Sequence, residues 1–153
     1  MSGKEQDFIK EAFDTNWVVP LGPNVNAFEK SLRDFLIEIE KLKVENEGKQ
    51  VVALSAGTAA LHLGLILLGV QAGDEVICQS FTFCASANPV TYLGATAVFV
   101  DSEEDTWNMN PVLLEEAIRD RIAKTGRKPK AIIPVHLYGM PAKMDEICAV
   151  AEK

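Results

Sequence analysis

The sequence predicts an α/β fold, in which a mostly parallel sheet carries helices on both faces and so forms three layers. From residue 50 onward, short apolar runs rich in β-branched residues alternate with longer stretches of helical spacing. Turns containing Gly, Asp or Pro separate these runs. The chain has 153 residues, 48% of them hydrophobic and 24% charged, which is typical of a globular protein with a real core.

Residues 1–49 are predicted to form a helical N-terminal segment. A short helix is expected over Lys4–Phe13, followed by a loop at Pro20, Gly22 and Pro23. Asn24 or Asn26 is the expected cap of the next helix. That helix places these apolar residues at helical spacing: Phe28, Leu32, Phe35, Leu36 and Ile39. The charged stretch from Glu38 to Lys49 is interpreted as a solvated helix end and loop.

Residues 50–153 are predicted to begin the sheet domain. Val51–Leu54 is a short β-branched run and is predicted to be a buried strand. SAGTAALHLGLILLGV then predicts a turn and a helix that ends near Gly69, and GDEVICQS predicts a turn and a second strand. A helical stretch follows over about Cys84–Leu93, where Pro89 either kinks the helix or lies in its first turn.

The remaining elements continue the same alternation. ATAVFVD predicts a third strand that ends at Asp101. Asn110 is expected to cap, and Pro111 to open, a helix over Val112–Lys124. AIIPVHLYG predicts a fourth strand with its exit loop, and PAKMDEICAVAEK the start of a last helix. The predicted order is therefore β-α-β-α-β-α-β-α, with right-handed crossovers.

Ligands of such sheets bind outside the carboxyl ends of the strands. That rule selects four loops of this chain, which are Ser55–Thr58, Gln79–Phe83, Asp101–Trp107 and His136–Met140.

Charge and composition exclude several classes of protein. The formal net charge is −7, so the chain has no electrostatic basis for nonspecific binding to nucleic acid or anionic membranes. No stretch is long and apolar enough to span a bilayer, and the N-terminus lacks the apolar core of a signal peptide. Three scattered cysteines suggest reduced thiols, and we expect a cytoplasmic protein. No metal site is predicted.

The loop Ser55–Ala60 has the features of an anion site. A predicted strand leads into small residues at which a helix starts, and the free N–H groups of a helix start attract anions. Gly57 would let the backbone approach a phosphate closely, and the Thr58 hydroxyl would add a donor. Alternatively, Ser55 or Thr58 simply caps a core helix. Neither a P-loop nor a dinucleotide-binding glycine motif is present, which disfavours nucleotide triphosphatases and dinucleotide oxidoreductases.

Two aromatic residues, Phe81 and Phe83, follow the predicted second strand directly. An aromatic ring at this position can stack on a flat ligand. The alternative is that both rings belong to the core.

Three blocks together resemble the start of the large domain of DegT/DnrJ/EryC1/StrS aminotransferases. They are SAGTAALHLGL, GDEVICQSFTFCASANPVTYLGATAVFVD and IIPVHLYGMPAKMDEI, in the order and spacing of that family. The upstream NWVVPLGPNVNAFEKSL is similar to the N-terminal segment of the family, so the resemblance covers about Phe8–Lys153. It implies part of the large domain of the fold-type I, aspartate aminotransferase-like fold, with pyridoxal 5'-phosphate (PLP) as the cofactor.

The resemblance assigns site residues one by one. Gly57, Thr58 and Ala59 match the phosphate-binding turn of the cofactor site, and Phe83 matches the residue that stacks on the pyridine ring. His136 and Tyr138 match a loop close to the pocket, where His136 is more often structural than catalytic. Trp17 and the Gly22-Pro23 turn match a segment near the substrate entrance, and no contacts are assigned to them.

Two groups that the chemistry needs are expected beyond residue 153. PLP-dependent transamination uses a lysine amine that bonds the cofactor and moves a proton, and a carboxylate beside the pyridine nitrogen. In the family both groups follow the block matched by PVHLYG. Lys124, Lys128, Lys130 and Lys143 do not match the position of that lysine, and neither Asp101 nor Asp105 matches the carboxylate. No catalytic residue is therefore assigned here, and residues 1–153 alone are predicted to be inactive.

The implied reaction of the whole enzyme is transfer of an amino group, usually from glutamate, to a keto carbon of a nucleotide-linked sugar. Such sugars feed polysaccharides or secondary metabolites, and the family resemblance implies a homodimer. A PLP-dependent dehydratase of related sugars stays open as an alternative. So do a catalytically dead binding or regulatory module and a flavodoxin-like domain, although the helical N-terminal segment argues against the last.

Overall fold

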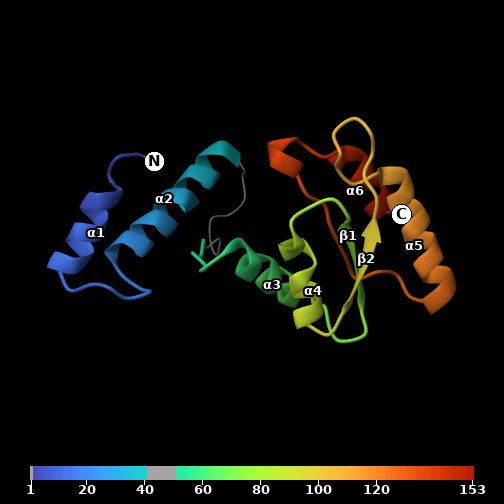
Figure 1. Cartoon of the computed structure of the whole chain (residues 1–153), viewed down its shortest axis with the longest axis horizontal. Helices are drawn as coiled ribbons and strands as arrows, with labels where there is room; N and C mark the ends of the chain where they lie inside the picture. The colour runs from blue at the N-terminus through green and yellow to red at the C-terminus, as the bar shows by residue number, and fades with distance from the viewer. Residues whose placement is uncertain (1, 41–50) are drawn as a thin grey trace. The chain divides into compact units, whose positions relative to one another are not determined.

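The computed structural model describes residues 2–40 and 51–153 and divides the chain into two compact units, Met1–Leu54 and Ser55–Lys153. The first unit is helical, whereas the second contains the sheet (Figure 1). None of the helices in these described ranges is long and apolar enough to cross a membrane.

The first unit consists of α1 (Glu5–Asp14), α2 (Pro23–Glu40) and the turn between them. In that turn the Trp17 indole N–H donates to the Leu21 carbonyl over 2.5 Å. A side chain at Gly22 would place its Cβ 2.2 Å from the indole nitrogen, so only glycine fits there. The predicted cap at Asn24 or Asn26 is wrong, since both lie inside α2. The helix opens at Pro23, a residue that suits the first helical position because it has no N–H to satisfy.

The second unit is built on a three-stranded parallel sheet with the order β2-β1-β3. The central strand β1 (Glu75–Gln79) pairs with β2 (Thr96–Val100) on one side and β3 (Ala131–Ile133) on the other. The strand predicted over Val51–Leu54 is wrong, because this segment forms no strand and groups with the first unit. Its Ala53 N–H donates to the Glu29 carboxylate at 2.8 Å instead of to a neighbouring strand. An apolar run becomes a strand only where another strand accepts its hydrogen bonds.

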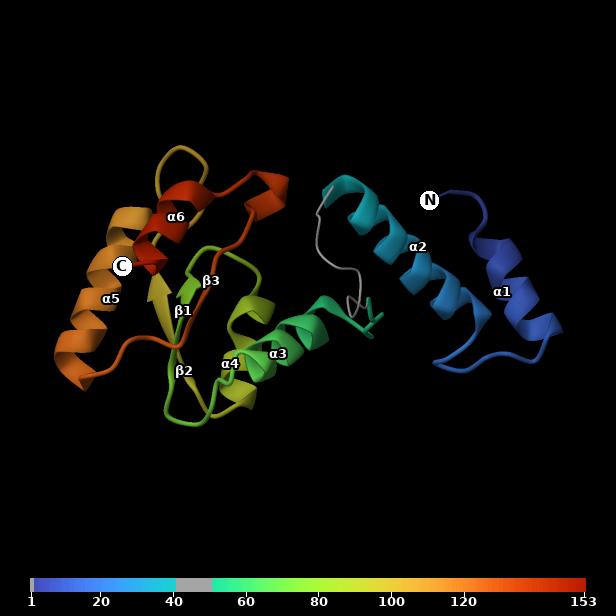
Figure 2. The same cartoon turned by 180° about the vertical axis from the view of Figure 1, so that it is seen from behind.

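Helices cover both faces of this sheet, which confirms the predicted three layers (Figure 2). α3 (Gly57–Leu67) and α4 (Asn88–Tyr92) pack on one face, with a core of Leu65, Val70, Val76, Cys78, Val90, Ala95 and Ile133. α5 (Pro111–Thr125) and α6 (Met144–Ala151) pack on the other, with a core of Ile77, Val100, Met109, Leu114, Ala142 and Ile147. Alternate residues of β1 enter opposite cores, as the period of two in a strand requires.

Several predicted helix ends are confirmed. The Asn110 side chain accepts hydrogen bonds from Val112 N at 2.9 Å and Leu113 N at 3.3 Å, and Pro111 opens α5. Gly126, with φ of 72°, ends the same helix in the left-handed conformation that glycine adopts without strain. Pro89 lies in the first turn of α4, after a short 3-10 turn over Cys84–Ser86.

Candidate functional site

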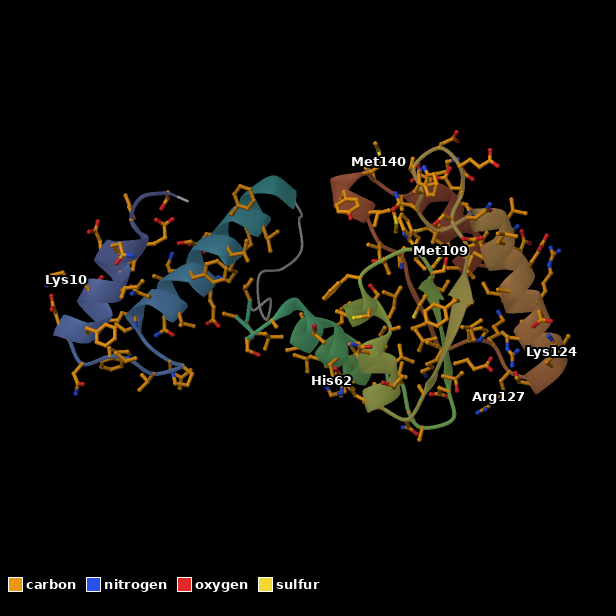
Figure 3. All side chains as sticks on the ribbon, in the orientation of Figure 1. Lys10, His62, Met109, Lys124, Arg127 and Met140 are labelled. Carbon is orange, nitrogen blue, oxygen red and sulfur yellow. The ribbon has the colours of Figure 1, made fainter. Side chains whose placement is uncertain are left out.

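The carboxyl ends of the three parallel strands bring three of the predicted ligand loops to one edge of the sheet. Gln79–Phe83 follows β1, Asp101–Trp107 follows β2 and His136–Met140 follows β3. In the second unit Met140 lies at this end, whereas Lys124 and Arg127 lie at the opposite end (Figure 3). The candidate site therefore comprises these loops and α3, which contacts the turn at Cys84–Ser86.

Gln79, the last residue of β1, is fully buried and joins two of the loops. Its amide nitrogen donates to the Phe81 carbonyl at 3.0 Å and to the Trp107 carbonyl at 3.4 Å. Its amide oxygen accepts from Met109 N at 2.9 Å. A buried amide is stable only when it is hydrogen-bonded, so Gln79 fixes the loop after β1 to the loop after β2.

Asn108 is also fully buried and joins the loop after β2 to the loop after β3. Its amide nitrogen donates to the Met140 carbonyl at 2.9 Å and to Thr106 Oγ1 at 3.1 Å. Its oxygen accepts from Leu137 N at 2.8 Å. With Gln79, it ties all three loops into one hydrogen-bonded network.

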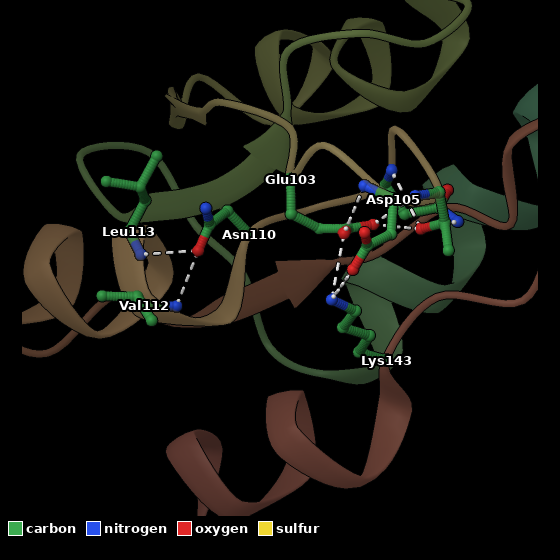
Figure 4. Close-up of polar contacts among 8 residues, drawn as sticks. Glu103, Asp105, Asn110, Val112, Leu113 and Lys143 are labelled. Atoms are coloured by element: carbon green, nitrogen blue, oxygen red, sulfur yellow. Dashed lines mark hydrogen bonds and ion pairs between the residues drawn. The ribbon is translucent and has the colours of Figure 1, made fainter.

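An ion-pair cluster connects the same loop to the start of α6 (Figure 4). The buried Glu103 carboxylate accepts from Lys143 Nζ at 3.0 Å, from Asp105 N and Thr106 N at 2.9 Å each, and from the Thr106 hydroxyl. These hydrogen bonds, with that of Thr106 Oγ1 the largest contribution, lower the pKa of Glu103 to about 2. Lys143 also binds Asp105 at 2.9 Å, and its two carboxylate partners raise its pKa.

One cavity at this edge contains two of the predicted site residues. It has a volume of about 520 Å³ and is lined by Phe81, Thr82, Phe83, Val135, Leu137 and Tyr138. Phe83 is 77% exposed and Tyr138 is 99% exposed, so the alternative that Phe83 is a core residue is wrong. Tyr138 has φ of 50°, a left-handed backbone that is uncommon outside glycine.

His136, by contrast, does not line that cavity. Its Nδ1 accepts a hydrogen bond from Ala142 N at 3.0 Å, which leaves the proton of the neutral ring on Nε2. This bond closes the loop between β3 and α6.

The predicted anion turn lies at the N-terminus of α3. Ala56 precedes the helix in an extended conformation, with no side-chain cap, and the helix begins at Gly57. The alternative in which Ser55 or Thr58 caps this helix is therefore wrong. No protein acceptor among the described residues is found for the N–H groups of Gly57 and Thr58. Nothing lies within 4 Å of the Cβ position of Gly57, so the turn is open to a ligand. Gly57, Thr58 and Ala59 do not line the cavity that holds Phe83.

Buried Cys78 can be excluded as a nucleophile. Burial raises the pKa of its thiol to about 11, so the thiolate is scarce at neutral pH.

Sequence reasoning missed the four residues that organise this edge, Gln79, Asn108, Glu103 and Lys143. One signal was available for Gln79, since it directly follows the apolar run Val76–Cys78 at the end of a strand. The other three lie in polar segments where nothing in the sequence separates a buried partner from a solvated one.

The comparisons with known proteins agree with this architecture. The sequence model of the DegT/DnrJ/EryC1/StrS aminotransferase family matches residues 1–153. EpsN of Bacillus subtilis, a proposed pyridoxal phosphate-dependent aminotransferase, is 51% identical over 99% of this chain and 36% of its own length. The GDP-perosamine synthase of Caulobacter vibrioides is 40% identical over 100% of this chain and 37% of its own length.

A solved structure shows the same fold. The DegT DnrJ EryC1 StrS aminotransferase from Brucella abortus superposes with a TM-score of 0.80 at 38% identity, over 96% of this chain and 36% of that protein. The chain thus spans about a third of the length of the relatives it matches.

Replacing Asn108 should destabilise the second unit strongly. Asn108→Ala leaves Leu137 N and the Met140 carbonyl without their partner, and we expect a loss of about 3 kcal/mol in the free energy of unfolding. Urea unfolding followed by circular dichroism measures this loss. Gln71→Ala removes an exposed amide from the same unit and should change the free energy by less than about 0.5 kcal/mol. Equal effects of the two substitutions would contradict the role of Asn108.

The Glu103 cluster should make stability depend on pH in acid. The pKa of Glu103 is lower in the folded chain than in the unfolded chain. The ionised carboxylate therefore contributes its full stabilisation of the folded state above the unfolded pKa of about 4.3, and this stabilisation is lost as pH falls toward 2. The difference in unfolding free energy between the chain and Glu103→Gln should be constant at pH 5–7 and shrink below about pH 4. Urea midpoints from pH 2.5 to 7 test this, and a difference that does not vary with pH would refute it.

Proposed function

Because the chain belongs to the DegT/DnrJ/EryC1/StrS aminotransferase family, we propose that it forms part of a PLP-dependent enzyme that aminates a nucleotide-linked keto-sugar, with glutamate as the expected amino donor. The observation that carries this proposal is the uncapped start of α3 in the same unit as the exposed Phe83 ring. A phosphate-bearing aromatic ligand needs both features.

The start of α3 suits the phosphate group of PLP. The N–H groups of Gly57 and Thr58 and the Thr58 hydroxyl are donors at the positive end of the helix dipole. Ala59 is small and half-buried beside them. In our proposal Gly57, Thr58 and Ala59 hold the phosphate, and the missing side chain of Gly57 lets it approach the backbone.

Phe83 suits the ring of the same cofactor. Its side chain is exposed, and the loop that carries it is fixed through the hydrogen bond between Gln79 and the Phe81 carbonyl. We propose that Phe83 stacks on the cofactor ring and that Tyr138 lines the pocket beside it. His136 positions its loop through Ala142 and does not move protons in this proposal.

When bound, PLP supplies an electron sink for breaking bonds at the amino-bearing carbon. The reaction also needs an unprotonated lysine amine. Lys143 cannot supply it, because Glu103 and Asp105 bind its ammonium group and raise its pKa. Lys130 lies at the amino end of the sheet, where its backbone N–H donates to the Glu75 carbonyl at 2.7 Å. We therefore propose that residues 1–153 bind PLP but do not transfer amino groups on their own.

The substrate class is drawn from the relatives. The name of the Caulobacter relative identifies a product linked to GDP, which supports a nucleotide-linked sugar as the substrate here. A role in polysaccharide biosynthesis, a cytoplasmic location and a homodimer are parts of the same proposal. So is the division into a helical segment over residues 1–49 and the first part of a PLP-binding domain over residues 50–153.

A PLP titration of the chain tests the proposal. We expect saturable quenching of protein fluorescence, reversed by inorganic phosphate because the phosphate group provides much of the binding. Phe83→Ala should weaken binding about tenfold, since it removes a stacked ring worth about 1 kcal/mol or more. The PLP-loaded chain should not convert glutamate and a keto-sugar nucleotide faster than free PLP does.

Phe99→Ala is the matched control, because Phe99 is also exposed, at 58%, but lies on β2 and does not line the Phe83 cavity. Its affinity for PLP should be unchanged. Binding that phosphate does not reverse, or equal losses in the two variants, would contradict the cofactor site. Amino transfer by residues 1–153 above that of free PLP would contradict the argument about the lysine.

A further inference from the structure

A second cavity lies on the other side of Phe81, between the loops that follow β1 and β2. Its volume is about 580 Å³, and Ser80, Phe81, Asp101, Ser102, Glu104 and Trp107 contribute to its lining. Phe81 also lines the cavity that contains Phe83, so the two cavities share a wall. Neither the family resemblance nor the proposed cofactor site accounts for this second cavity.

The charged side chains that line the cavity are all carboxylates. Asp101 Oδ1 accepts from Ser80 Oγ at 3.3 Å and from Ser102 N at 2.8 Å. Buried Ser102 Oγ has no hydrogen-bond partner among the described residues. Glu103 also lines the cavity and forms an ion pair with Lys143. Asp101 and Glu104, by contrast, form no ion pair in the described part of the chain. No lysine, arginine or histidine contributes to the lining.

Two aromatic rings form a corner of the same cavity. The ring centroids of Phe81 and Trp107 lie 5.7 Å apart, at an interplanar angle of 55°. Both side chains are at least half exposed, at 50% and 59%. Trp107 has φ of 63°, and its backbone is fixed by hydrogen bonds to Gln79 and to the Glu103 carbonyl. A large, half-exposed aromatic residue is thus carried on a hydrogen-bonded backbone in an uncommon conformation, and such conformations cluster at functional sites.

We propose that this cavity binds an amino-bearing pyranose, that is, a sugar ring with an ammonium group and free hydroxyls. Its ammonium group and hydroxyls would donate to Asp101 and Glu104, and its apolar face and positive charge would lie against Trp107 and Phe81. The carboxylates exclude phosphates and carboxylic acids, because like charges would meet without a counter-ion.

This ligand is the sugar part of the aminated product without its nucleotide, because the carboxylates would repel the diphosphate of a nucleotide-linked sugar. That reading rests on the proposed function, whereas the binding site itself does not. Phe81 lines both cavities, so such a sugar would bind next to the cavity that contains Phe83.

The test uses Trp107 as the probe. The chain has two tryptophans, so Trp17→Phe makes Trp107 the only one, and its emission reports on the cavity. Glucosamine is titrated without PLP, with glucose and ethanolamine as the neutral sugar and the simple amine. We expect a saturable change with glucosamine, with half-saturation at a concentration at least about tenfold lower than for either control, because only glucosamine makes both kinds of contact.

Two substitutions locate the site. Asp101→Asn and Glu104→Gln each replace a carboxylate of the lining and should each raise the half-saturating concentration about tenfold. Glu116→Gln removes the same single negative charge at an exposed position of α5. It should change the half-saturating concentration of glucosamine by less than about twofold. The proposal is overturned if glucosamine gives no saturable change, if glucose or ethanolamine binds equally well, or if all three variants behave alike. Since no PLP is present, these results are independent of whether the chain binds PLP.

Discussion

Two buried side-chain amides, those of Gln79 and Asn108, hold the ligand edge of this molecule together. A parallel sheet brings loops to one edge but does not fix their conformations, because the strand hydrogen bonds end where the loops begin. Here the side chain of Gln79, at the end of β1, hydrogen-bonds the loops after β1 and β2. Asn108 adds the loop after β3 to this network. Both cavities owe their shape to these contacts, since Phe81, Trp107 and Leu137 are positioned by backbone atoms that the two amides bind.

The electrostatics of the second unit separate two kinds of binding surface. The start of α3 offers uncompensated N–H groups and favours anions, whereas the loop after β2 carries carboxylates and favours donors and cations. Lys143 does not reverse this pattern, because its ammonium group forms ion pairs with Glu103 and Asp105. A phosphate-bearing cofactor and an amino-bearing sugar would therefore be directed to different places by charge alone.

Much of the fold could be predicted from the sequence, because it depends on local patterns. The strands at Glu75–Gln79 and Thr96–Val100 and the cap at Asn110 follow from residue types and spacing. The prediction of a strand at Val51–Leu54 was wrong, because a strand needs a neighbouring strand to pair with and no local sequence pattern reveals whether one is present. Pro23, and not Asn24, sets the start of α2. Phe83 and Tyr138 could be proposed by resemblance. The roles of Gln79, Asn108 and Glu103 could not, because they depend on contacts between segments about 30 residues or more apart in the sequence. Examples are the hydrogen bonds of Gln79 with Met109 and of Asn108 with Met140.

The most direct test of this account is amide hydrogen exchange at Met109 and Leu137, the two backbone N–H groups that donate to the buried amides. Both lie outside the strands, so without the network they should exchange as fast as an exposed loop residue such as Glu104. We predict that both are protected to the same degree as Ile77 in the centre of β1, because the loops would then open only when the sheet opens. Exchange of Met109 and Leu137 at the rate of Glu104 would show that the loops move independently, and would contradict the claim that Gln79 and Asn108 hold the three loops together.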